Sequence, residues 1–223
     1  FVSHKFSLQY LNMALDTTLI IIIITVLVSL GGFNSDKVMN DLIFYPPAIS
    51  KQNQWYRFVT SGFLHADYSH LFFNMLTLYF FGRGMESFYN AYLGKMGFLI
   101  FYIAGIIISS IPTFIKHRND YHYRSLGASG GVSAVVFAYI LFAPWTWFTF
   151  PPVPAIIYAV LYIYYSIYMS KKGGDNINHD AHLWGAAFGV VFTIVMEPKI
   201  INFFLDQITH PKGLGAILFR LIS

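Results

Sequence analysis

The sequence predicts an all-α membrane protein built as a bundle of six transmembrane helices. Of the 223 residues, 56% are hydrophobic and only 11% are charged, whereas soluble domains carry about 25% charged residues. Six apolar segments follow one another along the chain, and a helix needs about 20 mostly apolar residues to cross the hydrocarbon core of a bilayer. The chain therefore has too little charge for a water-facing surface and enough apolar length to cross a membrane repeatedly.

The six predicted spans are apolar runs separated by polar or proline-containing stretches. They cover approximately residues 15–33, 68–86, 94–115, 128–143, 154–170 and 181–197. The second, fourth and sixth are short or polar for spans that face lipid. Such segments are tolerated where their polar atoms face protein or a water-filled cavity, so this is where we expect those atoms to lie.

The connection between the first two spans, Asn34 to Asp67, is long and aromatic. Trp55 and Tyr56 suit the headgroup layer of a membrane, and Pro46-Pro47 is expected to break any helix there. We therefore predict a first loop that lies in the membrane interface. The spans make one domain, residues 1–198, and the broken apolar stretch 199–223 is predicted to be a C-terminal interfacial tail.

Charge and cysteine content narrow the possible partners. The 14 Lys and Arg residues are scattered singly, without the basic stretches interleaved with aromatic residues that indicate nucleic-acid binding. The chain has no cysteine, which rules out disulfides, thiolate metal sites and a cysteine nucleophile. Transmembrane proteins and membrane lipids are the expected partners, and no metal or nucleic acid is expected.

Strongly polar side chains at membrane depth are costly and are functional candidates by default. Such side chains occur near the starts of the second, fourth and sixth spans: His70 and Asn74, Ser129, and His182. In an antiparallel bundle the even-numbered spans run in the same direction, so these side chains are expected near one face of the membrane at similar depth. The sequence therefore predicts an active site assembled from three helices.

The serine and the histidine form a candidate Ser–His dyad. The Ser129 hydroxyl is a weak nucleophile that needs a base, and the His182 imidazole can take its proton and return it to the leaving amine. Asp180 is two residues from His182, and such positions do not face each other on a helix, so a dyad is preferred to a triad. Gly127 and Gly130 flank the serine in a GxSG pattern that lets a substrate approach the backbone.

Three groups can donate hydrogen bonds to the oxyanion that a Ser129 attack would create. The Ser129 backbone N–H lies near a predicted helix N-terminus. His70 and Asn74 are four residues apart and share one helix face. In a partly desolvated site, each such donor lowers the barrier by roughly 3 kcal/mol.

The sequence resembles the rhomboid family of intramembrane serine proteases from about Trp55 to Pro198. The resemblance rests on the number and order of the spans and on five motifs: WYR at 55–57, HADYSHLFFN at 65–74, GRGME at 82–86, GASG at 127–130 and AHLWGAAFG at 181–189. GxSG alone is a weak signal. Its combination with HxxxxHxxxN in the second span and AHxxGxxxG in the sixth is a strong one.

The resemblance implies a rhomboid-type bundle that cleaves transmembrane proteins near their helix ends with no metal or organic cofactor. It implies Ser129 as nucleophile, His182 as base, and His70, Asn74 and the Ser129 amide as oxyanion donors. Arg57 would brace the first loop, and Glu86 the opposite end of the second span. Gly185 would let the fourth and sixth spans approach closely.

One position departs from the pattern. Some family members carry a tyrosine four residues after the nucleophile, packed against the base, and here that position is Ser133. The resemblance leaves the partner of His182 open, with Tyr158, Tyr162 and Tyr165 of the fifth span as substitutes.

Other functions remain as alternatives. The glycine-rich stretch around Ser129 is also typical of close helix packing. A catalytically silent rhomboid-fold protein that binds or remodels its membrane-protein clients is the main alternative to a protease. A small transporter is disfavoured, since the spans contain no buried carboxylate pair. The compact, cysteine-free form favours the bacterial cytoplasmic membrane, with an organellar membrane as the alternative.

Overall fold

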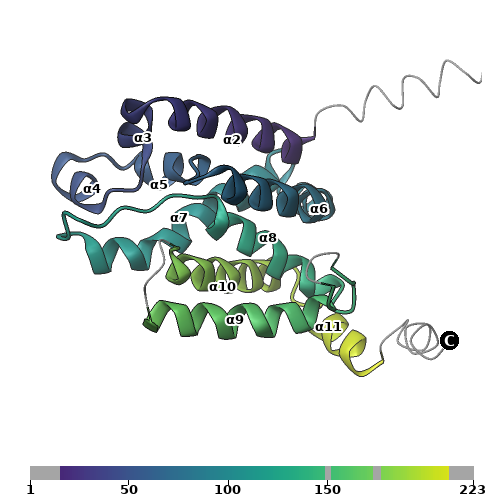
Figure 1. Ribbon diagram of the computed structural model, residues 1–223. Coiled ribbons are helices and arrows are strands. Elements are labelled where there is room, and N and C mark those ends of the chain that lie inside the picture. The colour runs from purple at the N-terminus through teal and green to yellow at the C-terminus, as the bar shows by residue number, and fades with distance from the viewer. Residues whose placement is uncertain (1–15, 149–151, 173–176, 211–223) are drawn as a thin grey trace, which may run out of the picture.

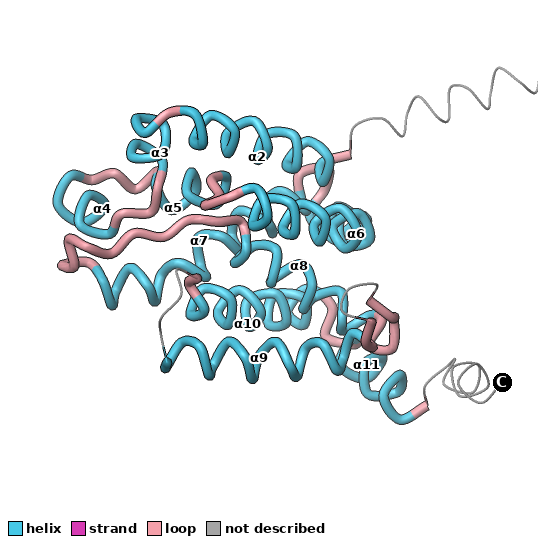
Figure 2. The backbone as a smooth tube through the Cα atoms, in the orientation of Figure 1, coloured by secondary structure: helices cyan, strands magenta, loops and turns pink. Residues whose placement is uncertain are grey.

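The protein folds as a stack of helices that enclose a central helix. The structure is a computed structural model that describes residues 16–148, 152–172 and 177–210, and within these ranges it contains no β-strand (Figures 1 and 2). The six long helices coincide with the six apolar segments of the sequence. They are α2 (Thr17–Asn34), α6 (Tyr68–Leu93), α7 (Gly97–His117), α8 (Ser129–Phe142), α9 (Ala155–Lys172) and α10 (His179–Met196).

The helices pack in an order that differs from their order in the chain. Helix α2 packs on α6, α6 on α8, α8 on α10, and α10 on α9, while α7 contacts α6, α8 and α10 (Figure 1). Helix α8 is central, and 11 of its residues are buried. A helix that is apolar on all sides lies either in a protein core or in a membrane. At 14 residues α8 is short for crossing a bilayer, and it lies in the middle of the bundle.

Length and apolar composition single out fewer membrane-crossing helices than the six predicted spans. Among the described residues, α2 and α7 are long and apolar enough to cross a bilayer. Helix α10 and the following α11 (Ile200–Thr209), which meet at a bend of 113°, would together make a third. The all-helical architecture is thus confirmed, while a bundle of six spans stays a prediction.

Helix α6 is longer than predicted. It continues past residue 86 to Leu93 and stops at Gly94, whose φ of +78° a residue with a side chain rarely adopts. The predicted span ends at residue 86, within the polar stretch GRGME, but charged side chains do not interrupt the backbone hydrogen bonds of a helix.

The first loop contains short helical pieces: α3 (Asp36–Leu42), α4 (Pro46–Gln52), α5 (Arg57–Thr60) and the 3-10 turn η1 (Ser61–Phe63). The expectation that Pro46-Pro47 breaks any helix is wrong, because α4 begins at Pro46. Proline lacks only an N–H that the first turn leaves unpaired anyway, and its fixed φ suits a helix start.

The predicted C-terminal tail, 199–223, is described in part. Helix α11 occupies most of its first half and contacts α8 and α10. The Trp145 indole N–H also donates a hydrogen bond of 2.8 Å to the Gln207 carbonyl. Residues 211–223 of the predicted tail and residues 1–15 of the predicted domain lie outside the described residues.

Candidate active site

Ser129 is the first residue of α8, directly after a turn that only glycine accommodates easily. Gly127 has a φ of +123° and donates its N–H to the carbonyl of Ser61 at 3.0 Å. A Cβ atom at Gly127 would lie 2.8 Å from Cε1 of His70. The glycine therefore allows both the backbone conformation and the close approach of the His70 ring to the chain before Ser129.

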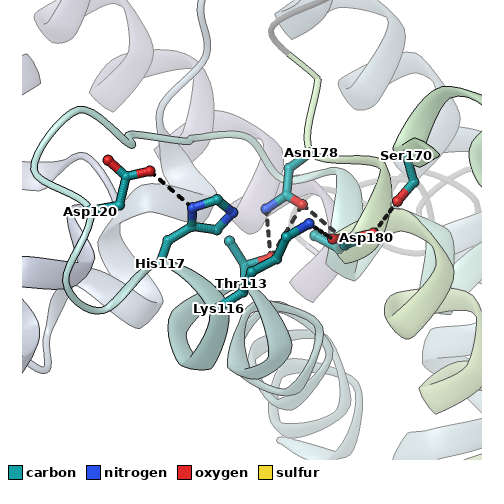
Figure 3. Close-up of polar contacts among 8 residues, drawn as sticks. Thr113, Lys116, His117, Asp120, Ser170, Asn178 and Asp180 are labelled. Carbon is teal, nitrogen blue, oxygen red and sulfur yellow. Dashed lines mark hydrogen bonds and ion pairs between the residues drawn. The ribbon is translucent and has the colours of Figure 1, made fainter. Parts of the chain in front are cut away.

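His182 lies in the first turn of α10, and hydrogen bonds fix the start of that helix (Figure 3). The Asn178 side chain caps the helix by accepting the Ala181 N–H at 3.0 Å. The same side chain exchanges hydrogen bonds with the Thr113 hydroxyl of α7, at 3.1 and 3.2 Å. An N-cap bond of this kind satisfies a backbone donor that the helix itself leaves unpaired, so the position of His182 is tied to α7.

Asp180, also in the first turn of α10, contacts Lys116 and Ser170. Its carboxylate lies 3.3 Å from the Lys116 ammonium of α7 and accepts a hydrogen bond from the Ser170 hydroxyl of α9 (Figure 3). The carboxylate thereby joins three helices at one end of the bundle.

The four residues that the sequence singles out line one cavity. Ser129 of α8, His182 of α10, and His70 and Asn74 of α6 all face it. The cavity measures about 170 Å³, and a single buried water needs roughly 10–15 Å³ by such a measure, so it has room for reacting groups and solvent. The remaining walls come from α6, α8, α9 and the residues before α10: Phe73, Thr77, Val132, Ser133, Val136, Phe137, Tyr158, Tyr162 and Ile177.

The aromatic neighbour of His182 comes from α9. The Tyr162 ring stacks on the His182 ring, with 5.7 Å between ring centroids and 23° between their planes. The Tyr162 hydroxyl is hydrogen-bonded to the hydroxyl of Ser133. Of the three tyrosines left open by the sequence, Tyr162 thus stacks on His182, and Ser133 forms a hydrogen bond with the same tyrosine.

The side chains on α6 are arranged within one turn. The Asn74 amide donates one hydrogen bond to the His70 carbonyl at 3.0 Å. An amide group carries two N–H donors, so this bond leaves one for another acceptor. The His70 ring packs edge-on against His65, with 4.9 Å between ring centroids.

The supporting residues predicted around the site have definite partners. The buried Arg57 donates hydrogen bonds to the carbonyls of Asn40 and Ile43 at 2.8 and 2.7 Å, within the first loop. At the other end of α6, Glu86 accepts three hydrogen bonds of 2.7–2.9 Å from the start of α2 (Thr17 N–H, Thr18 N–H and Thr18 hydroxyl).

Two glycines lie where α8 and α10 meet. A Cβ atom at Gly185 would overlap the carbonyl group of Gly130, and a Cβ atom at Gly130 would overlap the Ser109 hydroxyl of α7. Neither position has room for a side chain. Small residues at such positions let helix backbones come close. Gly185 brings together the helices that carry Ser129 and His182, and Gly130 lets α7 lie against α8.

His65 is a site neighbour that is not among the residues predicted from the sequence. It is fully buried between two chain segments. The Ala128 N–H, directly before Ser129, points to His65 Nε2 at 3.5 Å, and the Ser29 hydroxyl lies 3.0 Å from Nδ1. Because the Ser29 proton is donated to the Phe63 carbonyl, Nδ1 carries the histidine's proton. The only sequence signal was its place at the start of the HxxxxHxxxN motif.

Burial lowers the pKa of His65 to about 3, and the neighbouring His70 adds to this effect while Asp67 opposes it. His65 is therefore neutral near neutral pH, as its two hydrogen bonds require. Within the described ranges, no three His, Asp, Glu or Cys side chains are grouped closely enough to hold a metal ion.

Comparisons with known proteins cover the same region of the chain. The profile of the Rhomboid domain matches residues 52–199. RHOMBOID-like protein 12, mitochondrial, of Arabidopsis thaliana is 29% identical over 71% of this chain and 51% of its own length. The putative rhomboid protease YdcA of Bacillus subtilis is 28% identical over 66% of this chain and 69% of its own length. Rhomboid-like protein 11, chloroplastic, of Arabidopsis thaliana is 31% identical over 69% of this chain and 56% of its own length.

The match to the Rhomboid domain includes every residue that lines the cavity. The chain spans little more than half the length of the two plant relatives. With more than half of the chain matched by the domain profile, the protein belongs to the rhomboid family.

Proposed function

We propose that this protein is an intramembrane serine endopeptidase that cleaves transmembrane proteins near their helix ends with a Ser129–His182 dyad. The observation that carries the proposal is the cavity shared by Ser129, His182, His70 and Asn74. These residues come from three helices far apart in the sequence. Packing alone would not gather a hydroxyl, two imidazoles and an amide around one space at membrane depth.

The reaction follows from what each group can do. The Ser129 Oγ attacks the carbonyl carbon of the scissile peptide, and His182 accepts the hydroxyl proton. The tetrahedral intermediate then breaks its C–N bond as His182 returns the proton to the departing amine. A water molecule in the cavity then hydrolyses the acyl-enzyme. It attacks the ester carbon and gives a proton to His182, and the Ser129 oxygen leaves with that proton.

Three donors are available for the oxyanion. As the first residue of α8, Ser129 has a backbone N–H without a partner inside its helix. The second amide N–H of Asn74 and the His70 ring border the same cavity. Donors fixed in advance at a developing negative charge supply a large part of the rate enhancement of such enzymes.

The membrane setting belongs to the proposal. Integral location is supported by the apolar helices and the family. We propose six spans in which the short α8 and the helices α6 and α10, which carry polar side chains near their starts, line the protein interior. Residues 1–198 would form the catalytic domain and 199–223 an interfacial tail. The bacterial cytoplasmic membrane favoured by the sequence gains no support from relatives that include a mitochondrial and a chloroplast protein.

A fluorophosphonate probe tests the proposal directly, because it reacts only with an activated serine. Detergent-solubilised protein is treated with the probe and with a transmembrane substrate in parallel, alongside Ser129→Ala and His182→Ala. We expect labelling and cleavage in the wild type and neither in the two variants. Mass spectrometry of the labelled peptide should assign the adduct to Ser129 rather than to Ser133.

A matched control separates site chemistry from general effects of removing a hydroxyl. Ser87 is exposed on α6, away from the cavity, so Ser87→Ala should label and cleave like the wild type. A wild-type protein that neither labels nor cleaves would contradict the protease and support the catalytically silent alternative.

A further inference from the structure

Tyr162 connects three helices at the candidate site. It projects from α9, stacks on His182 of α10, and shares a hydrogen bond with Ser133 of α8. Ser133 follows Ser129 by four residues, so the two hydroxyls lie on the same face of α8. One tyrosine therefore links the helix of the candidate nucleophile to the ring of the candidate base.

Tyr162 is itself held firmly in place. Its face of α9 is the inward one, because Ala159 and Ser166, three before and four after it, are buried. The rings of Tyr158 and Phe137 border its ring on the other sides. With its hydroxyl bonded to the buried Ser133, the tyrosine has little freedom to rotate.

We infer that Tyr162, held by Ser133, is a positioning residue that sets the orientation of the His182 imidazole for proton transfer. This inference rests on the proposed function. Neither Ser129 nor His182 belongs to α9, so the catalytic geometry would depend on a third helix being docked against the dyad. Displacement of α9 would release the imidazole and lower the reaction rate without altering the dyad itself.

Two physical effects act through this contact. A ring stacked on the imidazole restricts its rotation, and a small error in the position of a catalytic group strongly reduces the rate. The ring centroid is also within the 6 Å at which an aromatic face attracts a cation. It therefore favours the imidazolium that exists only after His182 has taken the serine proton, which affects kcat more than substrate binding.

The test compares kcat and KM for one transmembrane substrate in Tyr162→Leu, Tyr162→Phe, Ser133→Ala and the Tyr162→Phe/Ser133→Ala double variant. Tyr162→Leu should lower kcat by about threefold to tenfold, the loss expected for an aromatic contact, with KM nearly unchanged. Tyr162→Phe and Ser133→Ala should each cause a smaller loss. Because they break the same bond, the double variant should lose no more than either single one.

A second measurement does not depend on turnover. In protein with isotope-labelled histidines, the signals of the His182 ring are identified by their absence in His182→Ala. They should shift in Tyr162→Leu, because the aromatic ring above the imidazole has gone. Tyr164 lies on the opposite side of α9 and is 71% exposed. Tyr164→Phe is therefore the matched control and should alter neither kcat nor the His182 signals.

The outcomes separate the inference from the proposed function. A wild type that labels and cleaves, with Tyr162→Leu at wild-type kcat or with additive losses in the double variant, overturns the inference and leaves the protease intact. A wild type without activity removes the proposed function, and unchanged His182 signals in Tyr162→Leu would then overturn the positioning contact by itself. If Tyr162→Leu does not fold, the kcat values of Tyr162→Phe, Ser133→Ala and their double variant test the inference.

Discussion

Gly185 of α10 lies against the carbonyl of Gly130 of α8, so closely that even a methyl group at Gly185 would overlap it. The obstacle is backbone rather than a flexible side chain, so it cannot move aside without displacing a helix. His182 is three residues before Gly185, and Ser129 is directly before Gly130. This one contact therefore sets how near the helices of the candidate dyad can come.

The contact predicts that Gly185→Ala both destabilises the protein and impairs the site. Overpacking of this kind costs about 1–3 kcal/mol of folding free energy, and a shift of α10 by about 1 Å lowers the reaction rate roughly 100-fold. Thermal unfolding in detergent and the rate of fluorophosphonate labelling measure the two effects. In the control Gly84→Ala, the new Cβ meets its nearest neighbour, Tyr139, at 3.7 Å, and stability should not fall. Unchanged stability and labelling in Gly185→Ala would contradict the prediction.

His65 predicts a pH dependence of stability. Its pKa is about 3 in the folded protein, well below the ordinary value of 6.5. Between these two pH values His65 is therefore protonated in the unfolded chain and neutral in the folded protein. The stabilising effect of neutral His65 is complete above pH 6.5 and is lost as the pH falls toward 3. The free energy of unfolding is expected to fall by up to about 1.4 kcal/mol for each pH unit below 6.5.

Denaturation in detergent between pH 7 and pH 5 measures this slope. It should be smaller in His65→Gln, which has no titrating group at that position. His122 is exposed in the loop before α8, and His122→Gln should retain the wild-type slope. Equal slopes in all three proteins would show that His65 is not the group responsible.

Asn74 is expected to act on the transition state rather than on the nucleophile. Removal of one oxyanion donor typically lowers kcat by about 100- to 1,000-fold, so Asn74→Ala should cleave slowly while Ser129 still reacts with the probe. Asn34→Ala is a matched control, because Asn34 makes the same amide-to-carbonyl bond to the residue four positions earlier on α2. Wild-type turnover in Asn74→Ala would remove Asn74 from the oxyanion role.

The sequence predicted the helices and the four cavity residues because both depend on local information. Apolar runs of sufficient length indicate helices, and the regular alternation of direction in a bundle places the starts of even-numbered helices together. The same reasoning overlooked α4, because a proline pair was treated as a helix breaker and not as a helix start.

Tertiary contacts could not be predicted in this way. Tyr158, Tyr162 and Tyr165 are three or four residues apart and lie on neighbouring parts of one face of α9. Only the rotation and depth of α9 against α10 decide that the middle one stacks on His182. The role of His65 could not be predicted for a similar reason, because its partners Ser29 and Ala128 lie 36 and 63 residues away in the sequence.

Asp180 distinguishes a dyad from a triad. Its carboxylate contacts Lys116 and Ser170, and the ion pair is partly exposed, with 59% of the lysine side chain accessible. Such pairs contribute at most about 1 kcal/mol to stability. Asp180→Asn should therefore unfold close to the wild-type temperature and lower kcat by less than about tenfold, whereas loss of a triad aspartate costs about 10,000-fold. Turnover measured beside His182→Ala makes the comparison, and a loss of Asp180→Asn activity approaching that of His182→Ala, at unchanged stability, would identify Asp180 as a third catalytic member.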